Sequence, residues 1–292
     1  MKKQSFIYVV IAGLLWGTSG IFAPILTPYG FTSVQMTAVR GLVSFVCLAL
    51  YALIRDRSLF RAKPIELILF IGIGTAIFLT ASCYYQSMQM TSAPTAVVLM
   101  YTAPVYVSVY SAVFFGERFS RLKLLSIALI LIGCCLVSGI VGGLKFDAVG
   151  ILLGILSGIS YAAYNILTKI ALRRGSSASS ATVYSFLTMA IIGLCVSQPA
   201  GIVECAARAP AAAYALLIGM GICTCVLPYF LYTLGMRGIS AGTASALGII
   251  EPMATTVYSV VIFKQALDAP SVIGIALILL AVLLLGRTEE PA

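Results

Sequence analysis

Histidine is absent from the 292 residues of this chain, and charged residues make up 9% of them. The missing imidazole excludes a histidine-based metal centre or catalytic site. The eight cysteines lack CxxC spacing and lie mostly in apolar runs, which is typical of small packing residues. No Walker motif or other phosphate loop is present, which argues against direct use of ATP. We therefore expect neither a metal nor a cofactor.

Hydrophobic residues, by contrast, make up 61% of the chain. A soluble domain carries about 25% charged residues, so this composition predicts a membrane protein. About 20 apolar residues in a helix cross a bilayer core of about 30 Å. Ten such segments follow one another with short connections, which predicts an all-α polytopic membrane protein with ten transmembrane helices and no soluble domain. The predicted spans are 6–26, 34–54, 65–86, 93–115, 122–141, 149–170, 179–199, 210–234, 241–263 and 270–286.

The net charge of +9 would suggest nucleic-acid binding in a soluble protein, but the positions of the basic residues indicate membrane topology instead. Placing the amino terminus in the cytoplasm puts the basic clusters at 2–3, 55–63, 118–123 and 169–174 on that side, where positive side chains are favoured. No small-residue cleavage site follows the first span, so we expect it to stay uncleaved. The sequence thus predicts a multi-pass protein of the cytoplasmic (inner) membrane with both termini in the cytoplasm.

The chain contains an internal repeat. SAPTAVVLMYTAPVYVSVYSAVFF at 92–115 aligns without a gap with SAGTASALGIIEPMATTVYSVVIF at 240–263, an offset of 148 residues. Each half holds five predicted spans, an odd number, so the second half should sit inverted relative to the first. We expect two five-helix repeats, 1–143 and 144–292. Inverted repeats are typical of secondary transporters, which place the substrate site near the bilayer midplane.

Several motifs in order resemble a known family across both halves. They are GLLWGTSGIF at 13–22, Arg40, YYQSMQMTSAPTAVVL at 84–99, the APVY and FFGERFS run at 103–120, and Glu251-Pro252. Together they resemble the EamA-type members of the drug/metabolite transporter superfamily. The resemblance implies ten spans in two inverted five-helix repeats, and a central cavity lined mainly by spans 1, 3, 4, 6, 8 and 9. It also implies transport of small metabolites, frequently amino acids or drugs and often outward, as efflux.

Glu251 is the acid placed deepest in a predicted span. An ionised side chain at mid-membrane costs roughly 2.5–3.5 kcal/mol, so it usually faces a cavity or a partner. Thr255 lies one turn further along the same weakly polar face of the helix. Glu251 either locks helix packing through a hydrogen bond or binds a cationic group or a coupling proton. The position matched to it in the first repeat is Ala103, which favours the functional interpretation.

Arg40 lies within the second predicted span, toward its outer end. Its side chain could extend to the external face, pair with Glu251, or bind a substrate carboxylate. A pair with Glu251 would offset much of the cost of burying both charges and could act as a gate. We therefore assign both residues to coupling or gating, and Glu251 to substrate binding as well.

Aromatic side chains near mid-depth are the other candidates for a cavity lining. Trp16, Tyr101 and Tyr161 lie there, with Tyr164 and Tyr229 nearer the inside. Their ring faces can hold apolar groups or, by cation–π attraction, amines. Several other tyrosines fit an interfacial belt instead. Asn165 either orients a polar group of the substrate or makes a hydrogen bond between helices.

Prolines inside the spans mark candidate gates. Pro104 and Pro252 occupy matched positions in the two repeats, and Pro228 interrupts the eighth span. Proline removes a backbone donor, so half-helices on either side of it can bend. Two glycine pairs, Gly72-Ile-Gly74 and Gly219-Met-Gly221, lie at roughly corresponding places in the two halves. Such features are also common in ordinary membrane helices.

Taken together, the sequence predicts a secondary active transporter, not an enzyme, that moves a small organic metabolite by alternating access. The solute would be an amino acid, an amine or a drug-like compound, and the protein an exporter or exchanger with proton coupling as an option. Its partners would be that solute and the lipid bilayer, with no nucleic acid. An intramembrane enzyme and a channel are the alternatives. The first lacks a nucleophile with a base or metal set, and the second lacks rings of polar residues.

Overall fold

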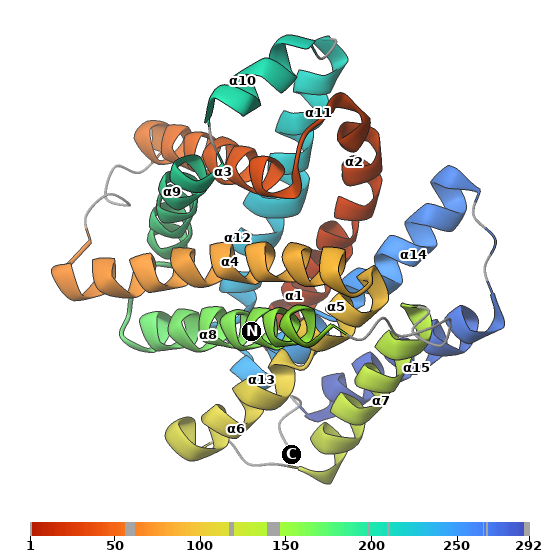
Figure 1. The fold of residues 1–292 in the computed structure, drawn as a ribbon. Helices are drawn as coiled ribbons and strands as arrows, with labels where there is room; N and C mark the ends of the chain where they lie inside the picture. The colour runs from red at the N-terminus through yellow and green to blue at the C-terminus, as the bar shows by residue number, and fades with distance from the viewer. Residues whose placement is uncertain are drawn as a thin grey trace.

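The computed structural model describes residues 2–55, 62–116, 120–138, 147–197, 199–208, 211–264, 266 and 268–288. Within these ranges the chain is helical throughout and contains no strand (Figure 1). The elements are α1 (Lys2–Gly17), α2 (Ser19–Leu26), η1 (Thr27–Tyr29), α3 (Ser33–Arg55), α4 (Pro64–Met90), α5 (Ala93–Met100), α6 (Ala103–Phe115), α7 (Arg121–Val137), α8 (Ala148–Arg173), α9 (Ala178–Val196), α10 (Pro199–Arg208), α11 (Ala211–Gly221), the π-helix η4 (Ile222–Val226), α12 (Leu227–Gly235), α13 (Ala241–Leu247), α14 (Ile250–Phe263) and α15 (Ala269–Thr288). The boundary at 143/144 and parts of the basic clusters 55–63 and 118–123 lie outside the described residues.

In the described chain, eight helical segments are long and apolar enough to cross a membrane, which supports a multi-pass membrane protein. They are Lys2–Phe22, Ser33–Ile54, Pro64–Met90, Thr95–Phe115, Ala148–Arg173, Ala178–Val196, Ala213–Gly235 and Ala241–Phe263. The two other predicted spans, 122–141 and 270–286, correspond to α7 with 17 residues and to the shorter apolar helix Ala269–Leu285. At 1.5 Å per residue, 17 residues extend about 25 Å, somewhat less than a full bilayer core.

The outer surface of these helices is apolar. Ile54 is 80% exposed, Leu283 69% and Val113 68%, and other large aliphatic side chains are exposed on most of the long helices. A soluble monomer rarely exposes so much contiguous apolar surface. Such a surface suits lipid chains.

Two of the spans are broken in the middle, and the breaks occupy matched positions in the repeat. Helix α5 ends at Met100 and α6 begins at Ala103, whereas α13 ends at Leu247 and α14 begins at Ile250. Pro104 and Pro252 stand in the first turn of α6 and α14, where a missing N–H costs no helical hydrogen bond. Each proline is therefore the cause of a helix restart, and each break leaves irregular backbone at mid-span.

The ends of these two helix pairs also match. Ser92 caps α5 by accepting a hydrogen bond from the Thr95 backbone N–H, and Ser240 caps α13 by accepting one from the N–H of Thr243. At the other end, α6 stops at Gly116 with φ 67° and α14 stops at Lys264 with φ 55°. The two segments thus share their start, their break and their end, as the aligned sequences predict.

A third span changes its winding in place of breaking. Between α11 and α12 the chain forms one π-helical segment, Ile222–Val226, just before Pro228. A proline removes the donor that would bond the carbonyl of Thr224, and the wider π turn accommodates this loss. The prediction of an irregularity near Pro228 did not include this change of helix type.

Close packing of small residues joins the helices. Helix α4 runs beside α8 and α9, and α7 runs beside α15 at one side of the bundle (Figure 1). A Cβ added at Gly133 of α7 would lie 2.8 Å from the carbonyl oxygen of Gly274 in α15. Small residues of this kind let membrane helices approach closely.

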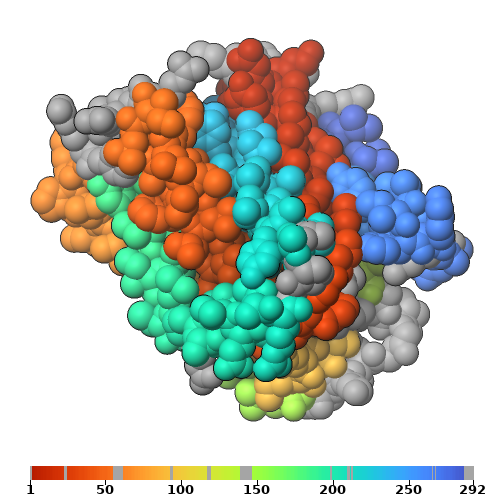
Figure 2. Space-filling view, turned by 90° about the horizontal axis from the view of Figure 1, so that it is seen from above, coloured from red at the N-terminus to blue at the C-terminus, as the bar shows by residue number. Residues whose placement is uncertain are grey.

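Helix α10 was not predicted, because nearly all of its residues fall in the connection between the predicted spans 179–199 and 210–234. It lies across one end of the bundle (Figure 1), and Figure 2 shows the teal atoms of this region beside the orange helix α3. Cys205 packs against a small cluster with Leu26, Phe31, Met36 and Leu217 at its centre. The helix therefore covers the ends of α2, α3 and α11.

Candidate functional site

A cavity of about 680 Å³ lies inside the bundle, within the usual size range of small-molecule sites. Its walls come from both halves of the chain, from α1 and α2 through to α14. Eight of the eleven residues predicted to form the site line it: Trp16, Arg40, Tyr101, Tyr161, Tyr229, Glu251, Pro252 and Thr255. The cavity is thus centred where the sequence suggested a site.

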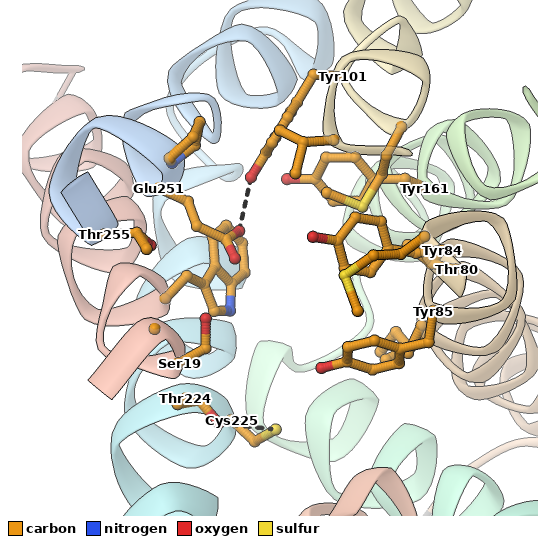
Figure 3. A pocket seen from close by; sticks show the side chains of 18 of the residues that line it. Ser19, Thr80, Tyr84, Tyr85, Tyr101, Tyr161, Thr224, Cys225, Glu251 and Thr255 are labelled. Carbon is orange, nitrogen blue, oxygen red and sulfur yellow. Dashed lines mark hydrogen bonds between the residues drawn. The ribbon is translucent and has the colours of Figure 1, made fainter. Parts of the chain in front are cut away.

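Glu251 and Tyr101 meet across the two helix breaks. The Tyr101 hydroxyl donates a hydrogen bond of 2.7 Å to Oε2 of Glu251 (Figure 3). Tyr101 stands in the break between α5 and α6, and Glu251 opens α14 directly after the other break. The broken helices therefore bring one residue from each half together, and the rest of the carboxylate faces the cavity. This hydrogen bond joins the halves without supplying a positive charge.

Arg40 faces the same cavity from α3. Its Nη2 donates to Oγ1 of Thr37 at 3.3 Å, and its buried Nε has no hydrogen-bond partner among the described residues. Within the described chain the one ion pair is Arg208–Glu204, so Arg40 and Glu251 are more than 4.0 Å apart. They do not form the direct pair considered from the sequence.

The GLLWGTSGIF motif holds the Glu251 helix in place. A Cβ added at Gly17 would lie 2.5 Å from the Cβ of Ala254, and one at Gly20 would collide with the methyl group of Thr255. Thr255 Oγ1 also donates a hydrogen bond of 3.1 Å to the carbonyl of Gly17. Because glycine has no side chain, α1 and α2 can approach α14 closely at both positions. This close approach brings Trp16 to the cavity. The sequence had given this motif only as part of the family resemblance, and its packing role was not predicted.

An aromatic layer closes one side of the cavity. The ring of Trp16 lies 5.1 Å from that of Tyr229 and 5.0 Å from that of Tyr232, measured between centroids. Tyr164 packs against both tyrosines from α8, and Tyr161 stacks on Tyr164 at 6.0 Å. Edge-to-face and stacked contacts of this kind contribute about 0.5–1.5 kcal/mol per pair beyond the burial of the rings.

Three of the predicted residues lie behind the cavity wall. Tyr164 belongs to the aromatic layer, and Pro104 is buried at the start of α6. Asn165 is fully buried; its Nδ2 donates to the carbonyl of Tyr161 at 2.7 Å, and its Oδ1 accepts from the Tyr232 hydroxyl. Asn165 therefore holds two aromatic residues in position, which corresponds to the hydrogen-bonding alternative for this residue.

Several lining residues were not among the predicted site. Thr80, Tyr84 and Tyr85 of α4 face Glu251 and Thr255 across the cavity (Figure 3). From their depth in the third predicted span, the two tyrosines lie nearer the outside than the mid-depth aromatic candidates, and they were not included in the predicted site. The position of a residue in a predicted span gives its depth in the membrane. It does not show which neighbouring helix that residue faces, so these residues could not be assigned to the site.

Thr224 and Cys225 also line the cavity, from the π-helical segment (Figure 3). Cys225 had been interpreted as a packing residue, and all eight cysteines, each of them described, are free. Pro228 was the available signal, because a proline four residues later disturbs the helix at Thr224. The position of a π turn does not follow from that signal alone.

The side chains that line the cavity can bind a solute through charges, hydroxyl groups and rings. Among the described residues, no group of three or more histidine, cysteine, aspartate or glutamate side chains could hold a metal. The cavity offers one carboxylate, one guanidinium, hydroxyl groups and aromatic faces. These groups can recognise a small polar organic molecule.

Replacing Trp16 or Tyr161 by alanine should weaken solute binding by about tenfold, because each removes an aromatic face from the cavity. Isothermal titration of the purified variants would measure this. Tyr51→Ala serves as the control, because Tyr51 is 52% exposed on the outer surface of α3. Unchanged affinity in both cavity variants would assign these residues to packing.

Comparison with known proteins agrees with this description. A sequence model of the EamA-like transporter family matches residues 4–139 and 148–287. An uncharacterized transporter of Archaeoglobus fulgidus is 30% identical over 289 residues, which cover 96% of this chain and 95% of that protein. The uncharacterized transporter YwfM of Bacillus subtilis is 25% identical over 97% of this chain and 94% of its own length. A solved crystal structure covers 100% of both chains with a TM-score of 0.79 and 19% identity, a likeness of fold.

Proposed function

Because this chain belongs to the EamA-like transporter family, within the drug/metabolite transporter superfamily, we propose that it is a secondary active transporter that works by alternating access. Its substrate is a small organic metabolite, and it acts as an exporter or exchanger in the cytoplasmic membrane, with both termini in the cytoplasm. The cavity between the two halves supports this proposal most strongly, since it presents Arg40 and Glu251 unpaired with each other. Buried charges in a membrane are costly unless a partner is present, and a bound solute can be that partner.

The described conformation corresponds to the outward-facing state in this proposal. Under the predicted topology, the lining residues of the spans that contain α4, α5 and α14 lie near the middle of the membrane or toward its outer face. The aromatic layer lies on the inner side of the cavity. Beyond it, Nζ of Lys169 donates hydrogen bonds of 2.6 Å to the carbonyls of both Met236 and Ile239, which join α8 to the link between α12 and α13. Opening to the cytoplasm would require these contacts to separate.

We further propose that residues 1–143 and 144–292 form two inverted repeats. The matched caps, breaks and ends of the α5–α6 and α13–α14 pairs support this, as do the two matches of the family model. Pro104 and Pro252 would then be the points about which the half-helices bend. The acid stands in one half alone, so substrate recognition is asymmetric on a repeated scaffold.

Reconstitution into liposomes tests the transport function. The probe is the solute that stabilises the purified protein most in a thermal-shift screen of amino acids, amines and nucleosides. We expect counterflow, in which unlabelled solute inside the vesicles drives saturable uptake of labelled solute. Liposomes without protein are the control. An ohmic current without saturation would instead establish a channel, and chemical conversion of the probe would establish an enzyme.

A further inference from the structure

A second cavity, of about 300 Å³, lies at the cytoplasmic end of the bundle under the predicted topology. Its walls come from the end of α8, the turn that follows α8, and the link between α12 and α13. It shares no described lining residue with the central cavity. Three of its lining residues are the basic Lys169, Arg173 and Arg237, and no acidic side chain among the described residues lines it. The cavity is therefore a concave patch of positive charge.

Contacts within the chain hold the three basic residues around this one cavity. Lys169 and Arg173 lie one turn apart on the same face of α8. The buried Nζ of Lys169 donates its hydrogen bonds to the carbonyls of Met236 and Ile239, which stand on either side of Arg237 in the chain. These carbonyls accept the bonds without neutralising the ammonium charge. A single phosphate-sized anion in the cavity can therefore lie near all three cations.

The two arginines have guanidinium donors available for such an anion. The guanidinium of Arg173 lies 4.2 Å from the ring centroid of Phe115 in α6, a cation–π contact that holds it beside the cavity and uses no carboxylate. Arg237 is exposed, and neither arginine takes part in an ion pair among the described residues. Guanidinium groups bind phosphate oxygens through two parallel N–H···O hydrogen bonds.

One acid, Glu66 of α4, forms a hydrogen bond with a residue of the cavity wall. Its Oε1 accepts a hydrogen bond of 2.7 Å from the hydroxyl of Ser176, and its Oε2 accepts one of 2.8 Å from the backbone N–H of Lys63. Both oxygens of this carboxylate thus have partners outside the basic cluster, and Glu66 itself does not line the cavity. The positive charge of the cavity is left for a ligand.

An apolar surface adjoins the basic cavity. Phe115, which carries the guanidinium of Arg173, is the last residue of α6, and the two residues before it, Val113 and Phe114, are 68% and 67% exposed. Acyl chains gain free energy by covering such side chains, whereas a soluble anion gains none. Basic pockets between membrane helices on the cytoplasmic side bind the headgroups of anionic lipids. The surroundings therefore favour a lipid over a free phosphate ion.

We propose that this cavity binds the phosphate group of an anionic phospholipid from the cytoplasmic leaflet. Arg173 and Arg237 are its ligands, Lys169 adds positive charge from the cavity wall, and an acyl chain covers the exposed end of α6. The bound lipid joins α8 to the link between α12 and α13, the same two elements that Lys169 connects. The site depends neither on the identity of the solute nor on transport.

Native mass spectrometry of the purified protein tests the lipid. The probes are dioleoyl phosphatidylglycerol and dioleoyl phosphatidylcholine, which share their acyl chains, whereas a choline cation balances the phosphate of the second. We expect the first phosphatidylglycerol to bind at least about tenfold more tightly than the first phosphatidylcholine. Equal affinity for the two lipids, or binding of neither, would contradict the proposal.

A double variant locates the bound phosphate. Arg173→Gln combined with Arg237→Gln should weaken phosphatidylglycerol binding at least about tenfold and leave phosphatidylcholine binding within about twofold. The matched control combines Arg121→Gln with Arg174→Gln, which removes the same charge from exposed arginines that do not line the cavity. It should bind phosphatidylglycerol like the wild type. Equal losses in the two double variants would show attraction to the whole basic face and would overturn the proposal.

Arg237→Gln alone covers the case in which the double variant does not fold, because it leaves the contact between Arg173 and Phe115 intact. It should weaken phosphatidylglycerol binding about fivefold. Wild-type affinity in every folded variant of these two arginines would also show that the site is wrong.

Thermal melts separate a lipid from a soluble anion. Phosphatidylglycerol should raise the melting temperature of the wild type but not that of the double variant of Arg173 and Arg237. Millimolar inorganic phosphate, compared with chloride at the same ionic strength, should leave the melting temperature unchanged. A rise with inorganic phosphate that matches the rise with the lipid, and that the same double variant loses, would contradict the lipid as the occupant.

Discussion

Glu251→Gln is expected to reduce transport by at least about thirtyfold while the protein still folds and inserts. The substitution keeps the shape of the side chain and its ability to accept from Tyr101, so the helix break and the contact between the halves should persist. What it removes is the carboxylate charge of the cavity. In the proposed complex this carboxylate pairs with a positive group of the solute. Losing one member of such a buried charge pair costs about 2–5 kcal/mol, and each 1.4 kcal/mol corresponds to about a tenfold change in affinity or rate.

Initial rates of counterflow in liposomes, measured from pH 5 to 8, would check this prediction. Glu204→Gln is the matched control, because Glu204 is exposed on α10 and should transport like the wild type. If Glu251 also carries a coupling proton, the wild-type rate should vary over this pH range and the residual rate of the variant should not. Wild-type rates in Glu251→Gln at every pH would exclude a role for this residue in binding and in coupling.

Gly74→Ala is expected to remove most of the folded protein that can be recovered in detergent. A Cβ at this position would overlap the carbonyl oxygen of Ser185 and lie 2.7 Å from the Cβ of Thr188, so α4 and α9 could not keep their distance. Overpacking of a tight helix contact typically costs about 1–3 kcal/mol, and backbone atoms cannot move aside as a side chain can. The glycine pair in α4 was predicted as a candidate gate, whereas these contacts favour a packing role for its second member.

Gly72→Ala is the control within the same pair. The nearest atom to an added Cβ there is the flexible Cδ1 of Leu167 at 3.1 Å, so we expect recovery and melting temperature close to those of the wild type. Fluorescence-detected size exclusion followed by a thermal melt would compare the two variants. Equal recovery of both would show that the approach of α4 and α9 is not limited by Gly74.

Composition and the repeat were sufficient to predict much of this architecture. Apolar runs of about 20 residues give membrane helices whatever their neighbours are, so eight of the predicted spans have counterparts that can cross a membrane. Pro104 and Pro252 predicted irregular backbone because a missing donor acts locally, and both helices restart there. Glu251 drew attention because an acid in an apolar span is costly wherever it points.

Other features depend on contacts between distant residues and could not be predicted. Tyr84 and Tyr85 line the cavity because their face of α4 meets the space in front of Glu251, a relation that a single helix does not contain. The close approach at Gly17 and Gly20 requires α14 as a partner. Helix α10 was missed because its ten residues are too few and too polar to be read as a span, so they were left as a connection between two spans.

The most direct test of the central claim is an experimental structure of the protein at a saturating concentration of the solute that binds it most tightly. The claim is that the cavity between Arg40 and Glu251 is the substrate site. We expect solute density in that cavity, with a positive group of the solute against Glu251. Density for the solute at any other place, with this cavity empty, would contradict it.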